Sequence, residues 1–345
     1  MKAAITDGKG KVWIGEVPRP VPGDYECLCK TKACATCTGT DSKHIHDKLP
    51  WAQTYPGLLG HESVGVVVEV GKKVRNFRAG DIVLRPAAAF PGTQLGGYTS
   101  MWGGFAEYGL VGDAAAMRAD NPEAKPNNYT RFQQVIPREA GISFVDATML
   151  ITLKECASYI ASSGVGFRSR VLVLGAGSVG MCMIRFAKVF GANPVIAVAR
   201  RDEQLAYVKD RIGADATVNV AKQDLLARVA ELTGGQGVDR IIDTTGDADF
   251  LRSALPALAP GGKVGAYATY TRGKARADIV APELEAGGAT GEDIAHPYLL
   301  DAVRLGLVPL SDYYSHVVPL ADLPRAFAMI ERKEAFKVVA TMEDL

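Results

Sequence analysis

The segment VLVLGAGSVG at residues 171–180 constrains the fold most strongly, because it places Gly175, Gly177 and Gly180 in a G-x-G-x-x-G pattern directly after an apolar run. The next residues, MCMIRFAKVFGA, have the amphipathic spacing of a helix. A tight strand-to-helix turn of this kind lets the backbone approach a pyrophosphate and points the helix N-terminus at it. We therefore expect these glycines to bind a dinucleotide cofactor rather than only to form a turn.

The residues around this segment alternate between short apolar runs and amphipathic stretches. A helix is expected from Ser143 to Gly164, and the expected strands are VLVL, VIAV, TVNV, DRIIDT and KVGAYA, which begin at residues 171, 195, 217, 239 and 263. Runs that are apolar on both faces and alternate with helices indicate a parallel sheet covered on both sides. The sequence thus predicts an α/β fold with a doubly wound nucleotide-binding domain.

The end of the second expected strand bears on which cofactor is bound. In NAD-binding domains this strand usually ends in Asp or Glu, which accepts hydrogen bonds from the ribose hydroxyls. Here the strand reads VIAVARRDE, and the acidic position falls on Ala199, followed by Arg200 and Arg201. A guanidinium suits a phosphate on the ribose, so we expect NADP, with NAD as second choice. Alternatively, the arginines only solvate the next helix and Asp202 takes the ribose role.

The residues before and after this domain have a different hydrophobic pattern. Up to about residue 112, period-two alternation in YECLCKTKA and SVGVVVEVGKKV, punctuated by glycines, predicts a small β-barrel or sandwich. Residues 113–139 are polar and contain three prolines, which favours a long surface excursion over a core element. From residue 292 we expect two more helices, DIAHPYLLDAVRLGL and LADLPRAFAMIERK, and a last strand, KVVATM.

Composition excludes several classes of protein. At roughly 150 residues per domain, a chain of 345 residues suggests two domains. A net charge of +1 argues against a nucleic-acid partner. No stretch reaches the ~18 apolar residues of a membrane span, and the N-terminus lacks the apolar region of a secretory signal. We expect a cytoplasmic protein without nucleic-acid or membrane partners, whose six cysteines remain thiols.

Metal-donor residues occur in the β-rich part. The pair CATC is only half of a structural zinc ribbon, but TCTGTD supplies Cys37, and LLGHESVG supplies His61 and Glu62. A catalytic zinc site takes a few ligands of mixed sulfur, nitrogen and oxygen type. Asp41 could accept the proton of the other His61 ring nitrogen and fix the tautomer. The alternatives are a redox dithiol or a buried core thiol at Cys37.

Together these motifs resemble the zinc-dependent medium-chain alcohol and polyol dehydrogenases, which include sorbitol, threonine and glucose dehydrogenases. The resemblance covers nearly the whole chain, through CTGTD, GHESVGVVVEVG, GDIV, GGFAEY, LGAGSVG and FKVVATM. It implies a GroES-like catalytic domain from residues 1–150 and the returning segment 292–345, and a Rossmann cofactor domain at 151–291. It also implies an active site in the cleft between these domains.

By the same resemblance, Cys37 and His61 are zinc ligands, Glu62 binds zinc directly or swings in, and Thr40 relays the substrate proton. The zinc lowers the pKa of a bound alcohol, and hydride moves between its carbon and the nicotinamide. The proton passes from Thr40 toward His44 or His46. The competing interpretation is that these histidines are exposed and have no such role.

Three departures from the family pattern stand out. Thr38 resembles a one-residue insertion between the ligand and the relay. No cysteine lies between Cys37 and Cys156, so the lobe for structural zinc is absent and one metal is expected. Ile151 occupies the position of the family's other acidic ligand. Glu155 lies one helical turn further on the same face, displaced by about 6 Å. Either Glu155 or water then completes the shell.

We therefore expect an enzyme that transfers hydride between NADP(H) and a secondary alcohol or ketone of a polyol, sugar or cyclitol. The alternatives are a zinc-free quinone or enoyl reductase and a catalytically inactive NADPH-sensing protein. Family members usually form dimers or tetramers, so we expect a homodimer or homotetramer. Four aromatic residues in segments that the family uses near the substrate either pack or stack on sugar rings: Trp51, Tyr98, Trp102 and Phe105.

Overall fold

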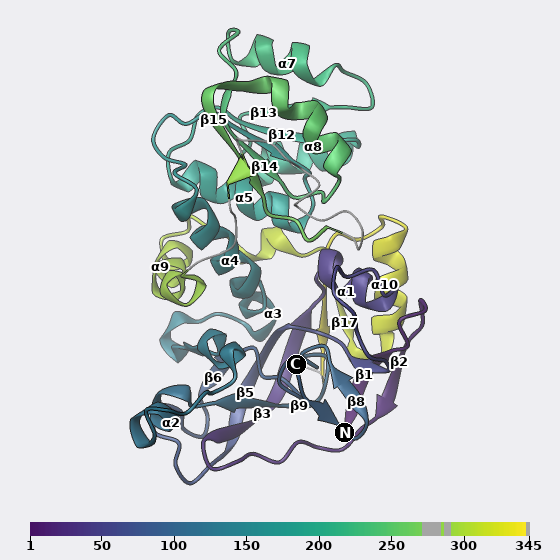
Figure 1. Ribbon diagram of the computed structural model, residues 1–345, viewed down its shortest axis with the longest axis vertical. Coiled ribbons are helices and arrows are strands. Elements are labelled where there is room, and N and C mark those ends of the chain that lie inside the picture. Colours follow the sequence, from purple (N-terminus) through teal and green to yellow (C-terminus); the bar gives the residue numbers. More distant parts are fainter. Residues whose placement is uncertain (271–283, 286–290, 343–345) are drawn as a thin grey trace. The chain divides into compact units, whose positions relative to one another are not determined.

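The computed structural model describes residues 1–270, 284–285 and 291–342. The chain forms two compact units (Figure 1). Unit 1 consists of Met1–Lys48, Ala52–Ile151 and Tyr314–Leu345, and unit 2 of Leu49–Trp51 and Thr152–Tyr313.

The chain returns to unit 1 later than residue 292, where the sequence placed the boundary. Helix α9 (Glu292–Arg304) belongs to unit 2. It is held there by a buried ion pair, in which Lys154 Nζ lies 3.3 Å from Glu292 Oε1, and by the buried side chain of Leu299. A buried charge requires a partner, so this pair joins α9 to α4 (Met149–Ser162).

Unit 2 contains the predicted parallel sheet. Its strand order is β13-β12-β11-β14-β15-β16, with bounds Ala216–Asn219, Val195–Ala199, Val171–Leu174, Val238–Asp243, Leu258–Ala266 and Leu284–Glu285. Every adjacent pair is parallel. The two central strands, β11 and β12, are buried almost throughout, which explains why they read as continuous apolar runs. The prediction of a doubly wound sheet is confirmed.

Helices lie against this sheet (Figure 1). They are α5 (Ser178–Val189), α6 (Asp202–Tyr207), α7 (Leu225–Leu232) and α8 (Ala248–Ala254), with short turns Val208–Ile212, Leu255–Ala257 and Leu310–Tyr313. Apolar side chains of the sheet and of α7 and α8 form one core cluster, which includes Leu172, Ile196, Val198, Val229 and Leu251. None of the helices in the described ranges is long and apolar enough to cross a membrane.

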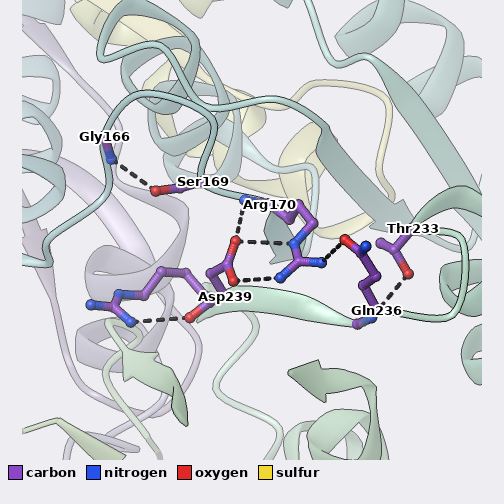
Figure 2. A network of polar contacts seen from close by, with 8 residues as sticks. Gly166, Ser169, Arg170, Thr233, Gln236 and Asp239 are labelled. Atoms are coloured by element: carbon purple, nitrogen blue, oxygen red, sulfur yellow. Dashed lines mark hydrogen bonds and ion pairs between the residues drawn. The ribbon is translucent and has the colours of Figure 1, made fainter. Parts of the chain in front are cut away.

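A polar network joins the amino ends of the central strands (Figure 2). Arg170, just before β11, donates from Nη2 to Asp239 Oδ1 at 2.7 Å and from Nε to Asp239 Oδ2 at 3.1 Å. Its Nη1 donates to Gln236 Oε1 at 2.6 Å. The two-pronged pair aligns β11 with β14. The opposite, carboxyl edge is where open α/β sheets bind ligands.

Unit 1 consists mainly of two β-sheets. The first has the order β2-β1-β4-β8-β7, with bounds Val12–Glu16, Lys2–Thr6, Gly57–Leu58, Tyr98–Ser100 and Gln94–Leu95. The second has the order β10-β6-β5-β3-β18-β17, with bounds Val135–Ile136, Ile82–Leu84, Glu62–Val70, Glu26–Ala35, Val338–Thr341 and His316–Pro319, and β9 (Tyr108–Gly112) also pairs with β3. The chain's last strand β18 therefore lies beside β3, from the first tenth of the chain.

The helices of unit 1 are short: α1 (Thr38–Ile45), α2 (Ala114–Asp120), α3 (Phe144–Ala147) and α10 (Leu323–Glu331), with 3-10 turns Asn128–Phe132, Arg138–Ala140 and Leu320–Asp322. The prediction that residues 113–139 form only a surface excursion is wrong. Tyr129, Gln133 and Ile136 are buried. The amide of Gln133 donates to the carbonyl oxygens of Arg85 and Leu110, so side-chain hydrogen bonds fasten this polar segment to the sheet.

Candidate metal centre and cofactor site

Strand pairing brings the metal-donor residues of unit 1 together. Ala35 at the end of β3 pairs with Glu62 at the start of β5 and with Val339 in β18. Cys37 therefore follows β3 at the point where β5 and β18 begin. Residues far apart in the sequence meet because the antiparallel register fixes them at one edge.

Cys37, His61 and Glu62 offer ligand atoms that all lie within 4.8 Å of one another. Glu62 is buried, whereas Cys37 and His61 are partly exposed. Zinc takes sulfur at ~2.3 Å and nitrogen or oxygen at ~2.0–2.2 Å in tetrahedral sites, so a mixed group of this size fits one such ion. The predicted set of three donors thus comes together.

Asp41 supports this group from α1. Its Oδ2 accepts a hydrogen bond from the Cys37 backbone N–H at 2.8 Å, and its Oδ1 lies 3.6 Å from His61 Nδ1. That second distance is longer than a hydrogen bond, and neither of its two atoms has a hydrogen-bond partner in the described part of the chain. Since Nδ1 faces Asp41, Nε2 is the nitrogen left for a metal. Burial, opposed chiefly by His61, raises the pKa of Asp41 to about 6.

Glu62 has a second charged neighbour that the sequence analysis missed. Lys337 Nζ lies 2.5 Å from Glu62 Oε2, and both side chains are 2% exposed. Lys337 immediately precedes β18, whose backbone is fixed by hydrogen bonds to Thr36 at 2.8 and 2.9 Å. In the sequence, Lys337 is visible as a lysine directly before the apolar strand of FKVVATM. Nothing in that pattern shows that its side chain turns inward toward Glu62.

The Cys37 thiol is poised to exchange its proton for a cation. Burial, followed by the nearby Glu62 carboxylate, raises the pKa of Cys37 to about 12. Lys337 and a hydrogen bond with the Thr40 side chain oppose this effect. A divalent ion would supply the positive charge that stabilises a thiolate at this partly exposed position.

Thr40 lies beside the donor group despite the extra residue Thr38. Its side chain interacts with the Cys37 sulfur, and its backbone N–H bonds to the Cys37 carbonyl at 3.1 Å in the first turn of α1. The Thr38 hydroxyl instead donates to the carbonyl of Phe336 at 3.1 Å. The insertion is thus absorbed at the helix start.

The two candidate relay histidines have different surroundings. His46 Nε2 lies 2.8 Å from Glu331 Oε1 near the surface. His44 is 2% exposed, so the expectation that it is exposed is wrong. Neither ring nitrogen of His44 has a hydrogen-bond partner within the described residues, and burial, followed by His61, lowers its pKa to about 3.

Trp102 covers this group of rings. Its centroid lies 4.8 Å from that of His61 and 5.4 Å from that of His44. Trp102 has φ of 67°, a left-handed conformation that is costly for a bulky residue. Its ring contacts with the two histidines place Trp102 beside the metal-donor group.

Glu155, the sequence candidate for a further ligand, lies on α4 in unit 2. Its Oε2 accepts a hydrogen bond from Tyr267 Oη at 3.4 Å. Glu155 is not in the donor group that the described residues form. Ile151, at the position of the family's acidic ligand, is fully buried.

The glycine turn of unit 2 is closely packed at Gly180 and open at Gly177. A Cβ atom on Gly180 would lie 2.0 Å from the carbonyl oxygen of Gly175, so only glycine permits this contact between helix and turn. A Cβ on Gly177 would have no atom within 4 Å. Gly177 caps the amino end of α5 without a side-chain hydrogen bond, which leaves open space beside the helix N-terminus.

Arg200 and Arg201 are exposed between β12 and α6. Arg201 Nη2 donates to Gln204 Oε1 at 3.4 Å, and Gln204 Nε2 donates to the carbonyl of Ala176, in the glycine turn, at 2.5 Å. Asp202, the alternative ribose ligand, bonds to Asn219 Nδ2 at 2.6 Å and to Lys222. Its carboxylate is therefore already engaged.

Comparison with known proteins identifies the family. Residues 23–121 match the family model of the alcohol dehydrogenase GroES-like domain, and residues 178–285 match that of the zinc-binding dehydrogenases. The chain is 30% identical over 338 residues to the NADP-dependent isopropanol dehydrogenase of Thermoanaerobacter brockii, covering 94% of this chain and 92% of that protein. The chain belongs to the zinc-dependent medium-chain alcohol dehydrogenases. The predicted family and the predicted GroES-like and Rossmann folds are confirmed, and the protein is an NAD(P)-dependent dehydrogenase.

Further proteins that this chain is similar to are also named as dehydrogenases. The L-threonine 3-dehydrogenase of Bacillus velezensis is 27% identical over 336 residues, covering 94% of each chain. Among solved structures, the alcohol dehydrogenase of Thermus sp. ATN1 superposes with a TM-score of 0.77 at 25% identity, covering 99% of each chain. The 2R,3R-butanediol dehydrogenase of Bacillus subtilis shares the fold, with a TM-score of 0.76, 24% identity and 99% of each chain covered.

Proposed function

We propose that this dehydrogenase transfers hydride between NADP(H) and a secondary alcohol or ketone, with one zinc ion held by Cys37, His61 and Glu62. The observation that carries the proposal is the group of thiol, imidazole and carboxylate donors within 4.8 Å. When bound, zinc lowers the pKa of the alcohol and the nicotinamide exchanges the hydride. The donor set fits zinc and does not suit magnesium or calcium, which prefer oxygen.

The chain's own residues hold the ion and move the proton. Cys37 supplies the thiolate, and Asp41 orients His61 so that Nε2 is free. Thr40 takes the hydroxyl proton of the substrate. Of the two histidines, His46 is the better acceptor beyond Thr40, because burial and the neighbouring His61 lower the pKa of His44 to about 3 and so disfavour its protonated form. His46 Nε2 instead lies 2.8 Å from the Glu331 carboxylate near the surface.

The remaining position of the zinc shell belongs to Glu155 or to water. We expect Glu155→Gln to lower zinc retention during dialysis against a chelator if Glu155 is the ligand, and to leave it unchanged if water completes the shell. Zinc content after dialysis, measured beside Glu139→Gln at an exposed position, separates the two.

For the cofactor, Ala199 removes the carboxylate that would bind ribose hydroxyls, and Arg200 and Arg201 offer guanidinium groups to a ribose phosphate. Engagement of Asp202 by Asn219 and Lys222 supports NADP over NAD further. The relative from Thermoanaerobacter brockii is named as NADP-dependent, which agrees with this choice.

For the substrate, we propose a secondary alcohol on a polyhydroxylated molecule such as a polyol, sugar or cyclitol. Isopropanol, in the name of one relative, is a secondary alcohol. Trp102 beside the metal-donor group supplies an aromatic face on which a sugar ring could stack. The oligomer we expect is a homodimer or homotetramer, which light scattering coupled to gel filtration measures.

The test is a panel of polyols, cyclitols and simple secondary alcohols with NAD and with NADP, followed by absorbance of the reduced nicotinamide. We expect turnover of a polyhydroxylated substrate with NADP and loss of turnover in Cys37→Ser. A zinc-free protein that reduces quinones or enones would instead support the reductase alternative. NADPH binding without turnover of any substrate would support the sensor.

A further inference from the structure

The Asp202 side chain lies at the carboxyl edge of the parallel sheet, where it contacts Asn219 and Lys222; the side chains of Asp202 and Lys222 are each 64% exposed. It is the first residue of α6 and follows directly after Arg200 and Arg201. Its Oδ1 accepts a hydrogen bond from Asn219 Nδ2 at 2.6 Å, and its Oδ2 pairs with Lys222 Nζ. The hydrogen bonds from Lys222 and then Asn219 hold the pKa of Asp202 below its usual value.

Asn219 is fixed more firmly than a surface residue. It ends β13, is 5% exposed, and pairs with Ala199 at the end of β12. Its Oδ1 accepts a hydrogen bond from Ala221 N at 3.0 Å, and its own backbone N–H donates to Gln223 Oε1 at 3.0 Å. Because both the backbone and the side-chain oxygen are engaged, the amide nitrogen is aimed at Asp202.

The position of these contacts gives them a consequence for cofactor choice. A carboxylate beside the cofactor ribose accepts hydrogen bonds from the two hydroxyls of NAD and repels the phosphate of NADP. Asp202 is the first carboxylate after β12, and within the described residues its positively charged partner is Lys222. Without Lys222, the Asp202 carboxylate would therefore repel the ribose phosphate that Arg200 and Arg201 attract.

We infer that Lys222 and Asn219 determine the cofactor preference by keeping Asp202 neutralised and turned toward β13. Lys222 is a positioning residue here, and it acts on the cofactor through Asp202 rather than by contact with the phosphate. This inference deepens the proposed function and rests on its choice of NADP. It predicts that a single substitution at residue 222 shifts the protein toward NAD.

The experiment measures dissociation constants of NADPH and NADH by fluorescence titration of the complete protein without substrate. The variants are Lys222→Met, Asp202→Asn and the double variant. Lys73→Met is the matched control, because Lys73 pairs with Asp24 at 3.6 Å on unit 1, where both side chains are 51% exposed. Circular dichroism and thermal melting confirm that each variant folds.

We expect wild type to bind NADPH more tightly than NADH, and Lys222→Met to lower the ratio of NADPH to NADH affinity by about tenfold, as for the loss of one charged hydrogen bond. The double variant should regain the NADPH preference, because Asn at position 202 carries no negative charge that would repel the ribose phosphate. Lys73→Met should change neither constant.

Two results would overturn the inference while leaving the proposed function standing. One is a Lys222→Met variant with the wild-type ratio. The other is a double variant that stays as weak for NADPH as Lys222→Met, which would make Lys222 a direct phosphate ligand. Tighter binding of NADH than of NADPH by wild type would instead contradict the proposed cofactor itself.

Discussion

The ammonium nitrogen of Lys337 lies 2.5 Å from a carboxylate oxygen of Glu62, and both side chains are almost fully buried. The pair links the last strand of the chain to the metal-donor group at the start of β5. Removing one partner of a buried ion pair leaves an uncompensated charge, which costs more than removing both. Lys337 thus places a positive charge directly against the Glu62 carboxylate, beside Cys37 and His61.

We expect Lys337→Met to lower the free energy of unfolding of the zinc-free protein by about 3–5 kcal/mol, since it strands the Glu62 charge. The double variant Lys337→Met with Glu62→Gln should recover a large part of that loss. Urea unfolding followed by circular dichroism measures both. Equal stabilities of the single and double variants would show that the two charges are not coupled.

Zinc binding should release a proton from Cys37. Desolvation and the nearby Glu62 carboxylate raise the pKa of this thiol to about 12, so it is protonated at pH 7, whereas a metal binds the thiolate. Calorimetry of zinc binding in buffers of different ionisation enthalpy should show about one proton released per ion and an affinity that rises with pH. Binding with no proton release would contradict thiolate ligation, and Cys37→Ser provides the control.

Alanine substitutions at Gly177 and Gly180 should affect different properties, the first NADPH affinity and the second stability. In Gly177→Ala the methyl group meets no protein atom, and φ of −75° suits alanine, so we expect a folded protein that binds NADPH at least tenfold more weakly. In Gly180→Ala the methyl group collides with the Gly175 carbonyl, so we expect a lower melting temperature. Thermal melting and NADPH titration check both variants. Wild-type NADPH affinity in Gly177→Ala would refute a pyrophosphate at this turn.

Asp113 should make stability depend on acidic pH. It caps α2 through Ala116 N at 2.9 Å and also accepts from the backbone N–H groups of Arg75 and Asn76 at 2.8 and 2.9 Å. Burial alone would raise its pKa, but these hydrogen bonds outweigh burial and lower it below 3.8.

Because the folded pKa of Asp113 is depressed, its stabilisation is present above the unfolded pKa of about 3.9 and is lost as pH falls through the folded value. Asp113→Asn should cost about 1–3 kcal/mol at pH 7, and the difference from wild type should shrink below pH 4. Urea unfolding at several pH values measures it. If the difference in stability between wild type and Asp113→Asn instead grows as the pH falls, the depressed pKa assigned to Asp113 is contradicted.

Much of the fold follows from local pattern. The parallel sheet was predictable because β11 and β12 are buried on both faces and flanked by amphipathic helices. Cys37, His61 and Glu62 were predictable because their mixed sulfur, nitrogen and oxygen donors suit a zinc ion and occur in segments that resemble those of the family. The strand β18 was also predictable as an element, but its partner β3 was not, since pairing over some 300 residues leaves no local trace.

The features that the sequence could not give depend on side-chain direction. Lys337 turns inward only because β18 pairs with β3, and a lysine before a strand more often faces water. Residues 113–139 look like a surface loop by composition, yet Gln133 fastens them through backbone carbonyls. His44 likewise packs against Trp102, whose left-handed backbone no propensity predicts.

X-ray absorption spectroscopy at the zinc edge of the freshly purified protein tests the central claim most directly. The account predicts about one zinc per chain with one sulfur ligand near 2.3 Å and the remaining ligands nitrogen or oxygen near 2.0–2.2 Å. Cys37→Ser should remove the sulfur contribution. A protein without zinc, or zinc bound without sulfur, would contradict the assignment of Cys37, His61 and Glu62 as its ligands.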